Sequence, residues 1–168
     1  MDTQTERIMI TFKQGDVKFT YRIGGITLHK ECILFQKATA DPSKTFWFLP
    51  GGRAELCESA AETLQREMVE ELNVSVTIER PVFLLENFFE EDGVAHHEVG
   101  IYFLMKLPPD CYLCQQDGPF VSEDETDLPL IFEWHPLDQL VHLPIMPSFF
   151  CTALRTLPTQ FTHIVHIS

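Results

Sequence analysis

Residues 51–74 read GGRAELCESAAETLQREMVEELNV, and this stretch carries the most informative pattern in the chain. No Gly or Pro interrupts the run from Glu58 to Leu72, and apolar residues recur there at helical spacing, namely Ala61, Leu64, Met68 and Leu72. The spacing predicts an amphipathic helix with one face in the core. Asn73 follows the last helical residue, where a left-handed cap is favoured and Asn commonly replaces Gly.

Three glutamates gather on one flank of this helix. Glu67, Glu70 and Glu71 fall within roughly one 100° arc, because residues three and four positions apart share a face. Carboxylates this close repel one another unless a cation neutralises them, and hard oxygen ligands suit Mg²⁺ or Mn²⁺. The alternative is a solvated helix face, where such residues usually lie. The glycines at 51 and 52 let the backbone approach a ligand closely, so a carbonyl there is a further candidate ligand.

An ion-pair ladder is expected on the outer face of the helix. Arg66 lies one turn from both Glu62 and Glu70, and Glu58 lies one turn further back. Each exposed pair contributes only about 0.3 to 0.5 kcal/mol to stability. We therefore expect the ladder to orient side chains more than to stabilise the fold.

At these spacings the residues resemble the Nudix box: Gly52-x5-Glu58-x7-Arg66-Glu67-Met68-x-Glu70-Glu71-x-Asn73-Val74. Two positions depart from the usual pattern, since Asn73 replaces a Gly and Cys57 stands where many members have a second Gly. The resemblance implies an α/β fold, a Nudix-type α/β/α sandwich with a central mixed, curved β-sheet. It also implies Mg²⁺-dependent hydrolysis of a pyrophosphate bond in a nucleoside diphosphate linked to another group, such as a nucleotide sugar, a dinucleotide or a nucleoside triphosphate.

Site residues follow from the resemblance, position by position. It makes Glu67, Glu70, Glu71 and the carbonyl of Gly52 metal ligands, and it pairs Glu58 with Arg66 structurally. One carboxylate in such a cluster can serve as the catalytic base, because like charges resist joint ionisation. The candidate catalytic residues are Glu70, Glu67, Glu133 and Glu98, of which Glu133 and Glu98 are candidates for an extra base or ligand. The candidate substrate-binding residues are Arg22, Arg53 and Tyr102. The alternatives are a surface position for Glu133, an acid partner for Arg22 and a core position for Tyr102.

Outside the box, the pattern predicts mainly strands. They are expected at 8–12, 17–21, twice within 21–37, at 46–49, 81–89, 95–107, 130–135 and in the tail 161–168. Pro147 precedes a predicted second helix over 148–157, which Pro158 ends. Residues 108–129 predict an irregular loop, and Cys111-x-x-Cys114 within it lacks the second pair that a zinc site needs, which favours free thiols.

Composition limits the partners. The chain has 25 acidic against 12 basic residues, a formal net charge of −13, which disfavours nucleic acid and anionic membranes. The polar start MDTQTERIMI and the five scattered cysteines predict a cytoplasmic protein with reduced thiols. We expect one domain over residues 1–168, with residues 1–6 a candidate disordered tail, and a small-molecule nucleotide as ligand. The sequence is compatible with a homodimer. The alternative function is a catalytically silent Nudix-like module with a nucleotide-binding or regulatory role.

Overall fold

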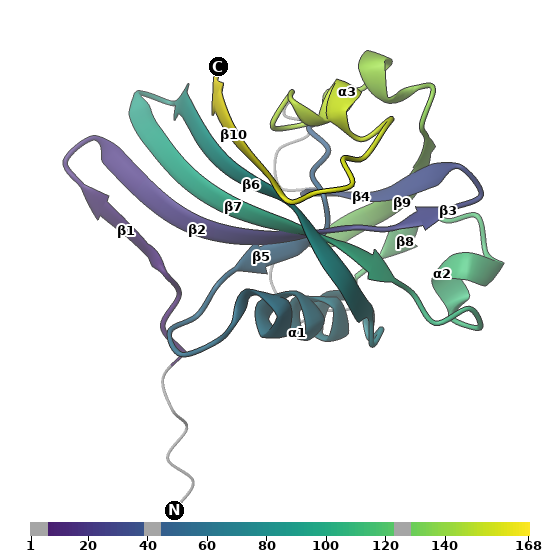
Figure 1. The fold of residues 1–168 in the computed structure, drawn as a ribbon. Coiled ribbons are helices and arrows are strands. Elements are labelled where there is room, and N and C mark those ends of the chain that lie inside the picture. The colour runs from purple at the N-terminus through teal and green to yellow at the C-terminus, as the bar shows by residue number, and fades with distance from the viewer. Residues whose placement is uncertain (1–6, 39–44, 123–128) are drawn as a thin grey trace, which may run out of the picture.

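The larger of two sheets in the computed structural model is mixed, and the structure describes residues 7–38, 45–122 and 129–168 (Figure 1). Its strands are β1 (Thr11–Gln14), β2 (Val17–Ile26), β5 (Gly51–Arg53), β6 (Thr77–Glu91), β7 (Val94–Lys106) and β10 (Thr162–Ile167). The order is β1-β2-β7-β6-β10, and β5 also pairs with β2. The β2–β7 and β6–β10 pairs are parallel, whereas the β1–β2, β2–β5 and β6–β7 pairs are antiparallel.

The smaller sheet is antiparallel and has the order β3-β4-β9-β8. Its strands are β3 (Leu28–His29), β4 (Cys32–Ala38), β8 (Phe120–Val121) and β9 (Leu130–Pro136). Lys30 and Glu31 form the β3–β4 turn with φ of 49° and 60°.

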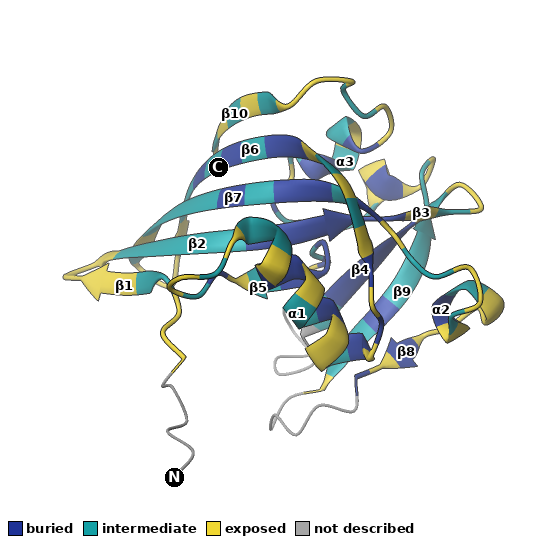
Figure 2. Ribbon diagram, turned by 60° about the horizontal axis from the view of Figure 1, so that its bottom comes forward, coloured by how far each residue is buried: buried dark blue, intermediate teal, exposed yellow. Residues whose placement is uncertain are grey.

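Helix α1 (Ala60–Leu72) matches the prediction closely. Ser59 and Glu62 form a capping box at its start, and Asn73 closes it in the left-handed region with φ 53°. Leu64, Met68 and Leu72 are buried, as the helical spacing predicted. Figure 2 shows α1 lying across the long strands, with buried and exposed residues alternating along it. The other helical segments are short: α2 (Tyr112–Gln115), η1 (Leu140–His142) and α3 (Phe150–Ala153).

Two apolar clusters lie on opposite faces of the larger sheet. Odd-numbered residues of β7 such as Phe103 pack in the cluster that contains Leu64 and Met68 of α1. Even-numbered residues such as Tyr102 pack in the cluster that contains Phe150 of α3. Helices therefore cover both faces of a mixed, curved sheet (Figure 1), which confirms the predicted α/β/α layering.

Two predicted elements are wrong in extent. Residues 46–49 do not form a strand, because Trp47 and Phe48 make only isolated bridges, to Ile145 and Gln36. The helix predicted over 148–157 is limited to the four residues of α3. One turn already buries Phe150 and Leu154, and the β-branched threonines at 152 and 156 favour helix extension poorly.

The segment 108–129 is less irregular than predicted, since it contains α2 and β8. Residues 1–6 and 123–128, including the candidate tail, lie outside the described residues. Within the described ranges, no helix is long and apolar enough to cross a membrane.

Candidate active site

Two glycines carry the chain from the sheet towards α1. Gly51 has φ 142°, and a side chain there would overlap the carbonyl oxygen of Ile23 on β2. A Cβ at Gly52 would overlap the carboxylate of Glu67. The missing side chain at Gly52 therefore makes the room in which Glu67 packs against the backbone of β5.

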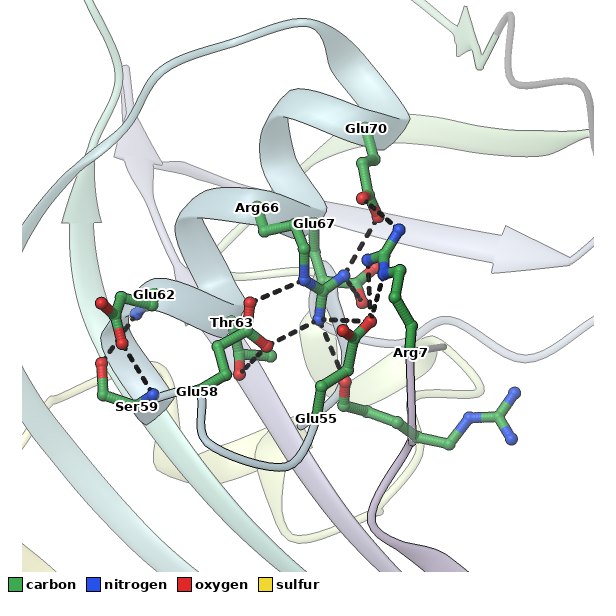
Figure 3. Close-up of polar contacts among 10 residues, drawn as sticks. Arg7, Glu55, Glu58, Ser59, Glu62, Thr63, Arg66, Glu67 and Glu70 are labelled. Atoms are coloured by element: carbon green, nitrogen blue, oxygen red, sulfur yellow. Dashed lines mark hydrogen bonds and ion pairs between the residues drawn. The ribbon is translucent and has the colours of Figure 1, made fainter. Parts of the chain in front are cut away.

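Arg66 joins the acidic residues of this region, as the dashed contacts in Figure 3 show. Its Nε and Nη2 atoms donate to the two oxygens of Glu58 at 2.8 and 3.0 Å. Its Nη1 atom donates to Oε1 of Glu67 at 2.7 Å and to Oε2 of Glu70 at 3.0 Å. Nη2 also donates to the carbonyl oxygen of Arg53 at 3.3 Å, so one guanidinium connects α1 to β5. These contacts confirm that Glu58 and Arg66 are paired.

The Glu58–Arg66 pair is partly buried, with 18% of each side chain exposed. The hydrogen bonds from Arg66 lower the pKa of Glu58, burial opposes this, and the Thr63 hydroxyl, which donates at 2.8 Å, lowers it further. The hydrogen bonds to Glu58 in turn raise the pKa of Arg66, again against burial. Both groups are thus charged at neutral pH, and their bidentate geometry fixes the direction of the Arg66 fork.

A second arginine reaches the same region and was missed at the sequence level. Arg7 donates through Nη1 to Oε1 of Glu70 at 2.8 Å and pairs through Nη2 with Oε1 of Glu55 at 2.7 Å. Both oxygens of Glu70 therefore contact an arginine. Arg7 and Glu55 are 48 residues apart, and no local pattern signals a pair at that separation. The Arg7 side chain is 53% exposed, so this contact is weaker than the Glu58–Arg66 pair.

The acidic flank, defined as Glu67, Glu70 and Glu71 of α1, has the donor chemistry of a hard-cation site. Glu71 is half-buried, and its Oε2 atom is shielded from solvent. Considering only described residues, no three His, Cys, Asp or Glu side chains stand close enough to enclose a metal ion. Glu67 and Glu70 instead face Arg66, so a metal ion at the acidic flank competes with guanidinium groups. The acidic flank therefore supplies carboxylate oxygens of the type that Mg²⁺ prefers, and Glu67 lies close to the backbone of Gly52.

Glu98 and Arg22 lie elsewhere, in a cavity of about 430 Å³. We call it the opposite-face pocket, and its lining includes Arg22, Phe46, Phe48, Asn87, Phe89 and Glu98. Glu98 shares the β7 face of Tyr102, away from α1, so the sheet separates it from the acidic flank. Arg22 donates to the carbonyl oxygen of Leu49 at 3.1 Å and is paired in register with Arg53 of β5.

Tyr102 is a core residue, with 1% of its surface exposed. Its ring fills the space left by Gly24 and Gly100 and packs against Phe150 at a centroid distance of 4.7 Å. The ring has no exposed face on which a base could stack, so the core interpretation of Tyr102 applies. Burial, and then the charge of Glu98, raise the pKa of Tyr102.

Glu133 lies on β9 of the smaller sheet. Its Oε2 atom is 3.5 Å from Nε2 of His135, and its register partner on β4 is Phe35. Burial lowers the pKa of His135, and the charge of Glu133 opposes this shift. The structure therefore places Glu133 beside His135 and outside the Arg66 network of Figure 3.

The chain thus carries an acidic helix flank behind a Gly-Gly turn on an α/β/α fold. Residues 19–150 match the family model described as the NUDIX domain, and the chain therefore belongs to the Nudix family.

Relatives are distant. Over 116 residues the chain is 28% identical to the uncharacterized Nudix hydrolase YvcI of Bacillus subtilis, covering 69% of this chain and 65% of the relative. Over 86 residues it is 33% identical to the low-salt glycan biosynthesis protein Agl8 of Haloferax volcanii, covering 49% and 55%. The chain thus spans less than two thirds of the length of either relative. The crystal structure of a Nudix hydrolase from Nitrosomonas europaea superposes with a TM-score of 0.56 at 17% identity, covering 89% and 78%, and shares the fold.

Proposed function

We propose that this protein is a metal-dependent hydrolase that cleaves a pyrophosphate bond in a nucleoside diphosphate linked to another group. The observation that carries the proposal is the acidic flank, in which Arg66 bonds both Glu67 and Glu70 while Glu67 packs against Gly52. The Nudix family membership and the hydrolase name of one relative support the same reaction class.

Each residue of the flank has a role in this proposal. Glu67, Glu70, Glu71 and the carbonyl of Gly52 would hold Mg²⁺, with Mn²⁺ as the alternative ion. When bound, the ion withdraws charge from the pyrophosphate and lowers the pKa of the attacking water. Arg66 keeps Glu67 and Glu70 in position, and the base is sought first among those two carboxylates. Glu133 receives no role, because it is held beside His135 in the other sheet.

The substrate side of the proposal lies in the opposite-face pocket. Its volume of about 430 Å³ is within the usual range for small-molecule sites. Arg22 and Glu98 line it, and the register places Arg53 beside Arg22. We therefore propose that Arg22, Arg53 and Glu98 contact a small nucleotide substrate. The net charge of −13 disfavours long nucleic acids as substrates.

The test combines a substrate panel with two matched variants. Nucleotide sugars, dinucleotides, nucleoside triphosphates and capped RNA are incubated with Mg²⁺ or Mn²⁺, and phosphate-containing products are measured. Glu70→Gln removes a proposed ligand and should lower turnover by at least about 100-fold. Glu62→Gln is the control on the same helix, because Gln preserves the capping box.

Two outcomes would count against the enzyme. Unchanged turnover in a folded Glu70→Gln protein would remove the metal-site assignment. Wild-type protein that binds nucleotides but cleaves none of the panel would instead support the catalytically silent binding module.

A further inference from the structure

One buried polar side chain in the opposite-face pocket, Asn87, has an acceptor atom without a hydrogen-bond partner among the described residues. Asn87 of β6 is 5% exposed, and among the described residues its Oδ1 atom has no hydrogen-bond partner. The β6–β7 register places Asn87 directly opposite Glu98, which also lines the pocket. A buried amide that lacks a hydrogen bond destabilises the protein, and such groups are rare in folded proteins. Asn87 therefore points to a ligand that completes its hydrogen bonding.

The walls of the pocket indicate the shape of that ligand. Phe46, Phe48 and Phe89 contribute aromatic rings from two separate segments of the chain. Aromatic rings bind planar groups through stacking or edge contacts. A carboxamide offers both an acceptor and donors in one plane. The combination suits a flat heteroaromatic ring with a polar edge better than a sugar, whose hydroxyl groups project in all directions.

The charge of the pocket indicates which part of a nucleotide can enter. Acidic residues at 90, 91, 92 and 98 line it, and Arg22 is the single cation among its described lining residues. This acidic surround repels phosphate. The neutral base is thus the part of a nucleotide that the opposite-face pocket accepts, while the phosphates lie outside it.

We propose that the opposite-face pocket binds the nucleobase of the substrate and that the Asn87 amide selects the base by pairing with its hydrogen-bonding edge. Oδ1 accepts from an N–H group of the base, and Nδ2 donates to the neighbouring acceptor. The inference rests on the proposed function, because the base belongs to the nucleoside diphosphate substrate. Asn87 then determines which base is accepted, whereas the acidic flank determines which bond is cut.

Binding measurements without turnover test this role. Isothermal titration compares AMP, CMP, GMP and UMP with ribose 5-phosphate, which has no base. We expect wild-type protein to prefer one of the four nucleotides over ribose 5-phosphate by at least about tenfold. Asn87→Leu should lower the affinity for that nucleotide by about 10-fold to 100-fold and make the affinities for the four nucleotides similar. It should not change the affinity for ribose 5-phosphate.

Two further variants keep the inference testable if Asn87→Leu folds poorly. Phe46 is 37% exposed, so Phe46→Ala should leave the fold intact. It should lower the affinity for the preferred nucleotide at least about fivefold, because the base loses a stacking partner. Glu70→Gln should retain the base preference, because it changes only the acidic flank. An inactive wild-type protein with a clear base preference would therefore contradict the proposed function and support this inference.

Stability separates a recognition role from a structural one. Because Oδ1 of Asn87 has no partner in the described part of the chain, Asn87→Leu should leave the Tm of the ligand-free protein unchanged or raise it. A marked loss of Tm would show that the amide supports the fold and would overturn the inference. Equal affinity of the wild-type protein for ribose 5-phosphate and all four nucleotides would overturn it as well, as would unchanged nucleotide affinity in Phe46→Ala.

Discussion

The acidic flank and the opposite-face pocket belong to the same domain but are assembled in different ways. The flank lies on a single helix, and its geometry follows from the period of α1 and from one arginine, Arg66. The pocket is assembled from β2, the segment at 46–48, β6, β7 and residues 146–147. A local element can therefore specify a cluster of carboxylates, while a pocket requires contacts between segments that are distant in the sequence.

The largest expected effect comes from Gly52→Ala. A methyl group there would overlap the carboxylate of Glu67 and displace it. A misplacement of about 1 Å near the chemistry commonly reduces rates about 100-fold. We expect kcat to fall by that factor while binding of the preferred nucleoside monophosphate is unchanged, measured by steady-state kinetics and titration. Loss of nucleotide binding along with kcat would show that the two regions are not separable.

The next largest effect concerns the stability that the Glu58–Arg66 pair gives to the helix α1 region. Glu58→Gln removes the charged partner of Arg66 and should lower the free energy of unfolding by about 1 to 3 kcal/mol at pH 7. The pKa of Glu58 is lowered in the folded protein from its ordinary value of 4.5. Its stabilisation is therefore complete above that value and is lost as the pH falls through the folded-state pKa.

Urea unfolding of wild-type and Glu58→Gln protein between pH 3 and pH 7 measures this effect. The difference between the two proteins should be largest at neutral pH and should shrink towards pH 3. A constant difference across the range would mean that the ionisation of Glu58 does not stabilise the fold.

Arg22→Gln tests the role of the opposite-face pocket in substrate binding. Arg22 is the cation among the described residues that line the opposite-face pocket, and it donates to the carbonyl oxygen of Leu49. Its loss should raise KM about tenfold with kcat nearly unchanged, because it removes binding shared by the ground and transition states. Steady-state kinetics on the best substrate of the panel measure this. A fall in kcat with constant KM would instead indicate that Arg22 acts in the chemical step proposed for the acidic flank.

The smallest effect is expected from Cys57→Gly in the loop before α1. Cys57 has φ 67°, a conformation in which most L-residues are strained and Gly is not. We expect the free energy of unfolding to rise by about 0.5 to 1 kcal/mol, after the larger entropy of Gly in the unfolded chain is subtracted. Thermal unfolding monitored by circular dichroism measures it, and a lower Tm would refute the strain argument.

The sequence predicted helix α1 and its acidic flank well, because the spacing of residues within one helix determines which of them share a face. Helical spacing located Leu64, Met68 and Leu72 in the core, and the cap at Asn73 has the expected left-handed backbone. The pairing of Glu58 with Arg66 also follows from a spacing of eight residues. The contact from Arg7 was missed, because it depends on a chain reversal that no short pattern encodes. The predicted Glu62–Arg66 link of the ladder was wrong, because the Glu62 side chain instead accepts from the backbone of Ser59 in the capping box.

The opposite-face pocket could not be predicted to the same degree. Glu98 was grouped with the helix glutamates, but strand alternation and the position of α1 place it on the other face of the sheet. Asn87 carried no signal at all, since a single Asn in an apolar strand is informative only when its missing hydrogen bond is seen. Phe46 and Phe48 were assigned to a strand, although they line the pocket from a segment with isolated bridges.

The central claim, that the acidic flank holds a divalent cation, is tested most directly by metal binding alone. Mn²⁺ is titrated into the wild-type protein, into a Glu67→Gln, Glu70→Gln, Glu71→Gln triple variant and into the Glu62→Gln control, with free Mn²⁺ followed by electron paramagnetic resonance. We predict that the wild-type protein and Glu62→Gln bind Mn²⁺ equally, and that the folded triple variant binds at least about 100-fold more weakly. Equal Mn²⁺ affinity in all three proteins would contradict the account.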